Sequence, residues 1–136
     1  MALNVALLRS SFELVVGLEP RLTHRFYEIL FERYPRAKAL FVRNAPATQE
    51  RMLTDALVAV VDHLEDAPWL AATLAQLGAK HKSYGVTDEM YGWVGASLLA
   101  TLAEVAGSLW SDQLAGAWTE AYGAIAGLMQ AGAAKS

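Results

Sequence analysis

The sequence predicts an all-α protein, and three observations support this fold class. Apolar residues recur at steps of three and four through most of the chain, which is the period of an amphipathic helix. No segment shows the period-two alternation of a strand with one exposed face. An excess of Ala and Leu, with four prolines and ten glycines, is typical of helices separated by short breaks.

The first two helices are predicted from apolar stripes that end at a glycine and at a proline. The stripe over residues 5–16 ends near Gly17 and consists of Leu7, Leu8, Phe12, Val15 and Val16. Pro20 suits the first turn of a helix, so a second helix is expected over residues 20–34, where Pro35 interrupts it. Its stripe consists of Leu22, Phe26, Tyr27, Leu30, Phe31 and Tyr34.

Two helices separated by a loop are expected next. Pro35 can itself open a short helix that runs through Phe41, and residues 42–47 then form a loop. A long helix begins near Thr48 and stops near residues 66–68. Its buried face consists of Met52, Leu53, Ala56, Leu57, Val60, Val61 and Leu64.

Three more helices complete the prediction. An alanine-rich helix over residues 69–82 carries its leucines on one side. Thr87, followed by two acidic residues, is a suitable N-cap for a helix that runs to about residue 106. Ser111 and Asp112 begin the last helix, whose stripe reaches Met129 before an Ala- and Gly-rich tail.

The composition limits the function classes. A chain of 136 residues fits one domain, expected to span residues 1–136. The net charge of −3 comes from interspersed acidic and basic residues, so neither nucleic acid nor an anionic membrane is an expected partner. Without cysteine, any metal would need His or carboxylate ligands. The start lacks signal-peptide features and no apolar run approaches the ~20 residues of a membrane span, so a cytoplasmic protein is expected.

Among the three histidines, His81 is the strongest candidate for binding chemistry. It continues the apolar stripe of its helix and stands at the end of that helix, between Lys80 and Lys82. Its imidazole can therefore project inward while the lysines stay in solvent. For His24, a solvated or satisfied core histidine is the simpler interpretation, and for His63 a partly exposed surface role.

Four landmarks occur in order along the chain: Phe26-Tyr27, Pro35 with Leu40-Phe41, Lys80-His81 with Gly85-Val86, and the segment from Trp118 to Gly123. In this order and spacing they resemble the globin family. The match covers essentially the whole chain and is closest to bacterial single-domain globins and the haemoglobin domain of flavohaemoglobins, with similarity to neuroglobin-like globins. It implies a globin fold of about six to eight helices around a haem pocket.

The resemblance implies that His81 is the proximal ligand of haem b, bound to the iron through one imidazole nitrogen. The other nitrogen would point back toward the carbonyl of Leu77, because the last turn of a helix leaves carbonyls unpaired. Tyr91 is a second candidate partner, since bacterial members of the family place a tyrosine ten residues after the histidine. Either partner would fix the orientation and basicity of the ring.

On the distal side, the resemblance implies that Tyr27 and Gln49 donate hydrogen bonds to a bound gas. Gln49 and Leu53 share one helix face, and Thr48 is the alternative to Gln49 if the preceding loop shifts the register by one residue. Phe41 corresponds to the aromatic residue that packs flat against the porphyrin. No histidine stands at the distal position, so a five-coordinate ferrous haem is expected.

Further residues are implied to line the pocket or to reach the haem edge. Those similar to proximal and lower pocket residues are Val86, Val94, Leu98 and Tyr122. The cations that could reach the propionates are Lys80 and Arg43.

One position departs from the family pattern. Flavohaemoglobin-type domains carry a glutamate about fifteen residues past the tryptophan of the last helix, whereas this chain has Ala133 there. Without that carboxylate in the proximal network, efficient oxygen activation is not expected.

Reversible binding of dioxygen, for storage, delivery or scavenging, is therefore the expected function, with no catalytic residue assigned. Nitric oxide dioxygenation with an external reductase and haem-based gas sensing are the alternatives. Nitric oxide and carbon monoxide are possible further ligands, and the protein is expected to be a monomer or a homodimer.

Overall fold

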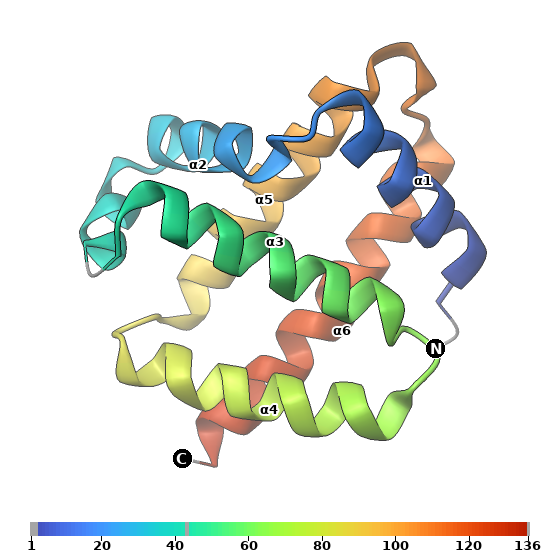
Figure 1. Cartoon of the computed structure of the whole chain (residues 1–136). Coiled ribbons are helices and arrows are strands. Elements are labelled where there is room, and N and C mark those ends of the chain that lie inside the picture. Colours follow the sequence, from blue (N-terminus) through green and yellow to red (C-terminus); the bar gives the residue numbers. More distant parts are fainter. Residues whose placement is uncertain (1–2, 43, 136) are drawn as a thin grey trace.

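The computed structural model describes residues 3–42 and 44–135, and every regular element within them is a helix (Figure 1). In chain order these are α1 (Val5–Leu18), α2 (Leu22–Arg33), the 3₁₀ helix η1 (Pro35–Phe41), α3 (Pro46–Asp62), α4 (Ala67–Ser83), α5 (Asp88–Ala106), the 3₁₀ helix η2 (Gly107–Leu109) and α6 (Asp112–Ala134). The predicted all-α class is confirmed.

Side-chain caps define the starts of three helices. Oδ1 of Asn4 accepts a hydrogen bond from the backbone nitrogen of Leu7 at the start of α1. Asp66 caps α4 in the same way, and Ser111 caps α6. Each cap satisfies a backbone donor that the first turn of a helix leaves without an intrahelical partner.

Some boundaries differ from those expected. Pro20 lies in a turn before α2, which begins at Leu22. α3 begins at Pro46 because the fixed φ of proline suits the first helical position, and it ends at Asp62. α6 continues through the tail to Ala134, since alanine has the highest helix propensity.

α4 and α6 cross with their backbones in contact. A β-carbon at Gly78 would clash with the backbone oxygen of Met129, and one at Gly132 would clash with the backbone of Ala75. Glycine is therefore required at both positions of this crossing. The crossing fixes the position of the helix that carries His81.

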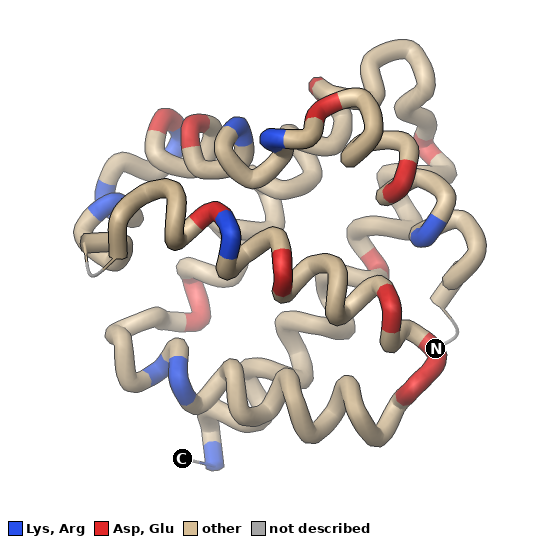
Figure 2. Tube along the Cα trace, in the orientation of Figure 1, with Lys and Arg blue, Asp and Glu red and all other residues tan. Residues whose placement is uncertain are grey.

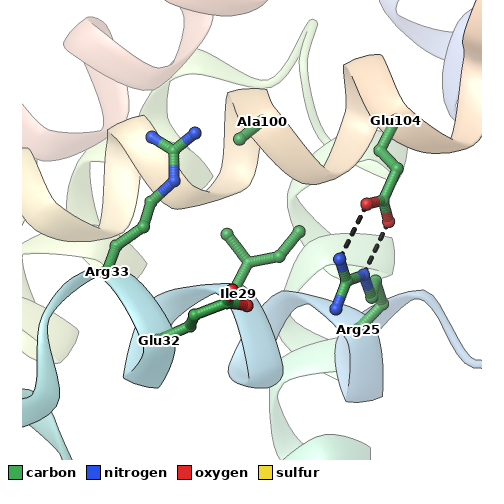
Figure 3. A pocket seen from close by; sticks show the side chains of 6 residues that line it. All are labelled: Arg25, Ile29, Glu32, Arg33, Ala100 and Glu104. Carbon is green, nitrogen blue, oxygen red and sulfur yellow. Dashed lines mark hydrogen bonds and ion pairs between the residues drawn. The ribbon is translucent and has the colours of Figure 1, made fainter.

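α5 packs between α1, α2 and α6. The guanidinium of Arg25 on α2 forms two hydrogen bonds with the carboxylate of Glu104 on α5, at 2.6 and 2.7 Å, and these bonds lower the pKa of Glu104 (Figure 3). A surface groove of about 250 Å³ lies beside this pair, and Arg33 also lines it. Both charges of the pair are thus already satisfied by each other.

α1 and α6 are joined by a buried polar contact. The indole nitrogen of Trp118 donates to the hydroxyl of Ser11 at 2.9 Å. The bond joins positions near the two ends of the chain and satisfies two buried polar groups.

The segment Asp88–Leu109 is long and apolar enough, by length and composition, to cross a membrane. The core helix of a soluble protein meets the same criterion, and eight residues of α5 are buried in this fold. Figure 2 shows acidic and basic residues distributed over several helices, in agreement with the interspersed charge of the sequence.

Candidate proximal and distal sides of a haem site

His81 lies in the last turn of α4 and is half-buried. Its Nδ1 lies 2.7 Å from the carbonyl oxygen of Leu77, one of the two partners expected from the sequence. A carbonyl oxygen can only accept, so Nδ1 carries a proton, and in the neutral ring Nε2 then keeps its lone pair. The histidine is therefore held in the tautomer that a metal ligand needs.

No group of three or more His, Cys, Asp or Glu side chains that could hold a metal ion occurs in the described part of the chain. A metal centre built from protein ligands alone is therefore not found there. One imidazole is nevertheless the usual protein ligand of haem iron, because the porphyrin supplies the other nitrogens. The donor set fits haem.

Tyr27 and Gln49 meet at a distance expected of a hydrogen bond. Nε2 of Gln49 on α3 donates to the hydroxyl of Tyr27 on α2 at 3.1 Å, and Nδ2 of Asn44 lies 3.4 Å from Oε1 of Gln49. Because Tyr27 accepts this bond, its own hydroxyl proton is free to be donated elsewhere. Of the two residues considered for the distal position, Gln49 rather than Thr48 makes this contact.

Burial raises the pKa of Tyr27 above its ordinary value, because the phenolate would lose more hydration than the phenol. The hydrogen bond from Gln49 opposes this shift, and the charge of Glu50 adds to it. Tyr27 thus remains a protonated donor at neutral pH.

η1 brings Phe41 against the same tyrosine. The ring of Phe41 meets that of Tyr27 edge to face at 5.3 Å between centroids, and Phe31 lies within 6 Å of both. Such aromatic contacts are favourable beyond the area that they bury. Phe41, Tyr27 and Gln49 therefore gather on one side of the fold.

Several apolar side chains of α2 to α6 remain half-buried while packing against the core. They include Phe31, Phe41, Leu53, Leu57, Leu77, Val94, Tyr122, Ile125 and Met129. In Figure 1 α4 runs below α3, and α3 packs on α2. The anchored imidazole of His81 is carried by α4, and Tyr27 and Gln49, here called the distal pair, are carried by α2 and α3. These groups together with half-buried apolar side chains fit a large apolar ligand such as haem.

The hydroxyl of Tyr91 does not reach His81. It is buried and has no hydrogen-bond partner within the described residues, and burial raises its pKa. The Leu77 carbonyl, and not Tyr91, is the partner of the His81 ring in this structure.

Tyr91 and Ala133 line the same recess, which measures about 550 Å³ and lies between the ends of α4 and α6 and the start of α5. Ala133, the position at which relatives are expected to carry a carboxylate, is therefore close to Tyr91 in space. The chain places a methyl group where that resemblance implied an acid.

The other implied pocket residues lie on α5, on α6 and in the turn before α5. The backbone nitrogen of Val86 donates to the carbonyl of His81 at 3.1 Å, and the hydroxyl of Tyr122 donates to the carbonyl of Tyr91 at 2.7 Å. Leu98 is buried and Val94 half-buried. For the propionates, Lys80 is exposed, and Arg43 lies outside the described residues.

The sequence reasoning missed the polar residues next to the distal pair. Thr23 contacts α3, and His24, interpreted as a solvated or satisfied core histidine, lies 2.9 Å from Glu50. A signal existed, because Thr23 precedes Tyr27 by four residues and so shares its helix face, and Glu50 follows Gln49 directly.

A helical fold with one anchored imidazole and a separate pair of hydrogen-bonding side chains defines a class of proteins that hold a prosthetic group through a single axial histidine. The family model that matches the chain is that of the globins, over residues 24–129. The chain belongs to the globin family.

Curated relatives include flavohemoproteins. That of Bacillus thuringiensis subsp. konkukian (strain 97-27) is 33% identical over 125 residues, which is 90% of this chain and 31% of the relative. That of Chromobacterium violaceum is 36% identical over 107 residues, which is 77% of this chain and 26% of the relative. The chain thus spans less than a third of the length of these relatives.

Two solved structures share the fold. An engineered carbene transferase, a putative nitric oxide dioxygenase from Rhodothermus marinus, superposes with a TM-score of 0.83 at 28% identity, covering 96% of this chain and 91% of that one. A bacterial globin from Campylobacter jejuni gives a TM-score of 0.81 at 24% identity, covering 96% and 94%. The globin fold is therefore shown, and membership of the family implies haem binding.

Proposed function

We propose that this globin holds haem b through His81 and binds dioxygen reversibly, with Tyr27 and Gln49 as distal donors. The observation that carries the proposal is the contact of Gln49 with Tyr27 at 3.1 Å, which leaves the tyrosine proton free. When bound, haem would supply a ferrous iron that takes up diatomic gases, nitric oxide and carbon monoxide included. The protein's own residues determine how that iron is held and which gas is favoured.

His81 contributes a neutral imidazole whose orientation is fixed by its bond to Leu77. Phe41 and Leu53 would pack against the porphyrin and keep water away from the distal donors, and Lys80 would reach a propionate. The pocket would be completed by Val86, Tyr91, Val94, Leu98 and Tyr122.

The distal donors favour a ligand that carries partial negative charge. Dioxygen draws electron density from ferrous iron more strongly than carbon monoxide does, so a phenol and an amide would stabilise it selectively. In a dry pocket each bond contributes about 1–3 kcal/mol. Slow release of dioxygen follows.

Haem retention tests the proposal. The purified chain is expected to show a Soret band, and His81→Ala is expected to lose haem, while His63→Ala, a histidine that stacks on Trp69 instead, keeps it. Because haem binds the folded state, it should also raise the melting temperature. A chain that folds fully and takes up no haem would refute the proposal.

Nitric oxide dioxygenation is the second candidate function, and the similarity to a putative nitric oxide dioxygenase favours it. Nitric oxide and dioxygen would yield nitrate, with the electron supplied by a separate reductase. Ala133 beside Tyr91 argues against efficient turnover, since this position supplies no carboxylate to the proximal side. Steady-state nitric oxide consumption with a supplied reductase supports this function, and a single stoichiometric reaction contradicts it.

The cellular setting proposed is the cytoplasm, without a membrane or nucleic-acid partner. The chain is proposed to act as one globin domain over residues 1–136, as a monomer or a homodimer. An external reductase is the proposed protein partner.

A further inference from the structure

We propose that Thr23, His24, Glu50 and Thr54 form a polar clamp between α2 and α3 that positions Gln49 against Tyr27. We name these four residues the α2–α3 clamp. The inference rests on the proposed function, because it assigns positioning residues to the distal side of that same site. None of the four is proposed to touch a bound gas.

The first half of the clamp is a pair of hydroxyl groups. The hydroxyl of Thr23 lies 3.1 Å from the carbonyl oxygen of Glu50 and 2.9 Å from the hydroxyl of Thr54. Thr54 donates its own proton to the Glu50 carbonyl at 2.9 Å, so Thr23 is the donor toward this pair. Thr23 is buried, so leaving its hydroxyl without a hydrogen-bond partner would cost free energy.

The second half is an imidazole and a carboxylate. Nδ1 of His24 lies 2.9 Å from Oε2 of Glu50, and Nε2 lies 3.8 Å from the carboxylate of Glu28 on its own helix. The Glu50 side chain is 20% exposed and that of His24 39%, so the contact is only partly open to solvent. Glu50 is thus held to α2 through both its backbone and its side chain.

The rest of α3 explains why such a clamp matters. Within α3, all of which the structure describes, the buried side chains are those of Val60 and Val61 near its end. The same end receives hydrogen bonds from Arg9 on α1, at 3.2 Å to the carbonyl of Val61 and 3.3 Å to that of Asp62. The beginning of α3 has no side chain buried to this degree, and Leu53 there is only half-buried against the core, so its polar contacts with α2 contribute to its position.

The clamp is adjacent in sequence to the distal pair on both helices. Glu50 follows Gln49, and Thr23 lies one helical turn before Tyr27. The bond between Gln49 and Tyr27 is already 3.1 Å long, and hydrogen bonds weaken beyond about 3.2 Å. A small movement of the start of α3 away from α2 would therefore break the distal pair.

The test compares oxygen dissociation rates of the haem-loaded full chain. Thr23→Val removes the hydroxyl while keeping the shape, and is expected to speed dissociation about fivefold, whereas Thr23→Ser keeps the slow rate. The matched control is Thr101→Val, because this buried threonine donates to Ser97 within α5. In a Gln49→Leu background, Thr23→Val should not increase the oxygen dissociation rate further. A merely structural role of Thr23 would not produce this result.

Two further measurements keep the test decisive. His24→Ala changes a partly exposed residue and is expected to speed dissociation about twofold even if Thr23→Val folds poorly. Amide hydrogen exchange of the full chain without added ligand should become faster over residues 46–54 in both variants, and not over residues 60–62.

The outcomes separate the clamp from the distal pair. If Gln49→Leu and Tyr27→Phe speed dissociation while Thr23→Val and His24→Ala leave both the rate and the exchange unchanged, the clamp is wrong and the proposed function stands. If neither Gln49→Leu nor Tyr27→Phe changes the rate, the distal assignment fails and the clamp's positioning role fails with it.

Discussion

The hydroxyl proton of Tyr27 is the atom on which the distal proposal depends. Gln49 donates to the tyrosine oxygen, so the proton is directed away from that bond. Burial raises the pKa of Tyr27, which keeps the proton in place. Under the proposed function, this proton is the one that Tyr27 would donate to a ligand with partial negative charge.

Replacing Tyr27 by Phe should speed oxygen dissociation tenfold or more, because about 1.4 kcal/mol or more of hydrogen-bond energy is lost. Stopped-flow displacement of dioxygen by carbon monoxide measures this rate. Tyr34→Phe is the control, since that ring stacks on Trp93 at the other end of α2. An unchanged rate in Tyr27→Phe places the hydroxyl out of reach of the gas.

Single residues also show what the sequence could and could not predict. The contact of His81 with Leu77 was predictable, because both partners belong to one helix turn. The contact of Thr23 with Glu50 was not, since it depends on how closely two helices approach. The spacing of residues along one helix does not predict the distance between polar groups on two different helices.

The crossing of α4 and α6 requires glycine at Gly78, and it positions the helix that carries His81. Gly78 lies one turn before His81 on α4 and faces the backbone of Met129 on α6. The crossing sets the distance between the two helices, and with it the position of the His81 imidazole.

Gly78→Ala should therefore lower the free energy of unfolding by about 1–3 kcal/mol and weaken haem retention, because the added methyl group forces α4 away from α6. Gly92→Ala, on α5 with nothing within 4 Å of the new β-carbon, should be neutral or gain up to about 1 kcal/mol. For both variants, urea denaturation measures the free energy of unfolding, and haem transfer to an acceptor protein measures haem retention. Equal behaviour of the two variants would contradict the close crossing.

At the scale of elements, apolar stripes predicted the six α-helices but not every boundary, and the short η2 was not predicted. α3 begins at Pro46 rather than near Thr48, and α2 begins after Pro20. Proline is compatible with both the turn before a helix and its first position, so the sequence alone left these starts open. The crossing at Gly78 could not be predicted for a different reason. A glycine within a helix does not indicate which residue of another helix packs against it.

The whole molecule should lose stability at alkaline pH. Burial raises the pKa of Tyr27, Tyr91 and Tyr122 above the ordinary value of 10.0. Each raised pKa favours the folded state below pH 10, and this contribution is lost as the pH rises toward the folded-state pKa. Denaturant unfolding between about pH 9 and 11.5 should show a steeper fall for the wild type than for Tyr122→Phe, and equal slopes would contradict it.

For the whole chain, the order and spacing of landmarks predicted the globin fold, which the family match and the solved structures confirm. The site residues remain proposals, although the structure brings Tyr27, Gln49 and Phe41 together. The two partners expected for the His81 ring were not distinguished from the sequence, because the burial of the Tyr91 hydroxyl, without a hydrogen-bond partner among the described residues, depends on packing that the sequence does not show.

Repeated oxygenation of the ferrous haem-loaded chain, followed by absorption spectroscopy, tests the central claim most directly. The account predicts one haem per chain, a five-coordinate spectrum without oxygen, and a spectrum that returns to this state each time oxygen is removed. Oxidation to the ferric form in the first cycle, or a six-coordinate ferrous spectrum that oxygen does not change, would contradict it.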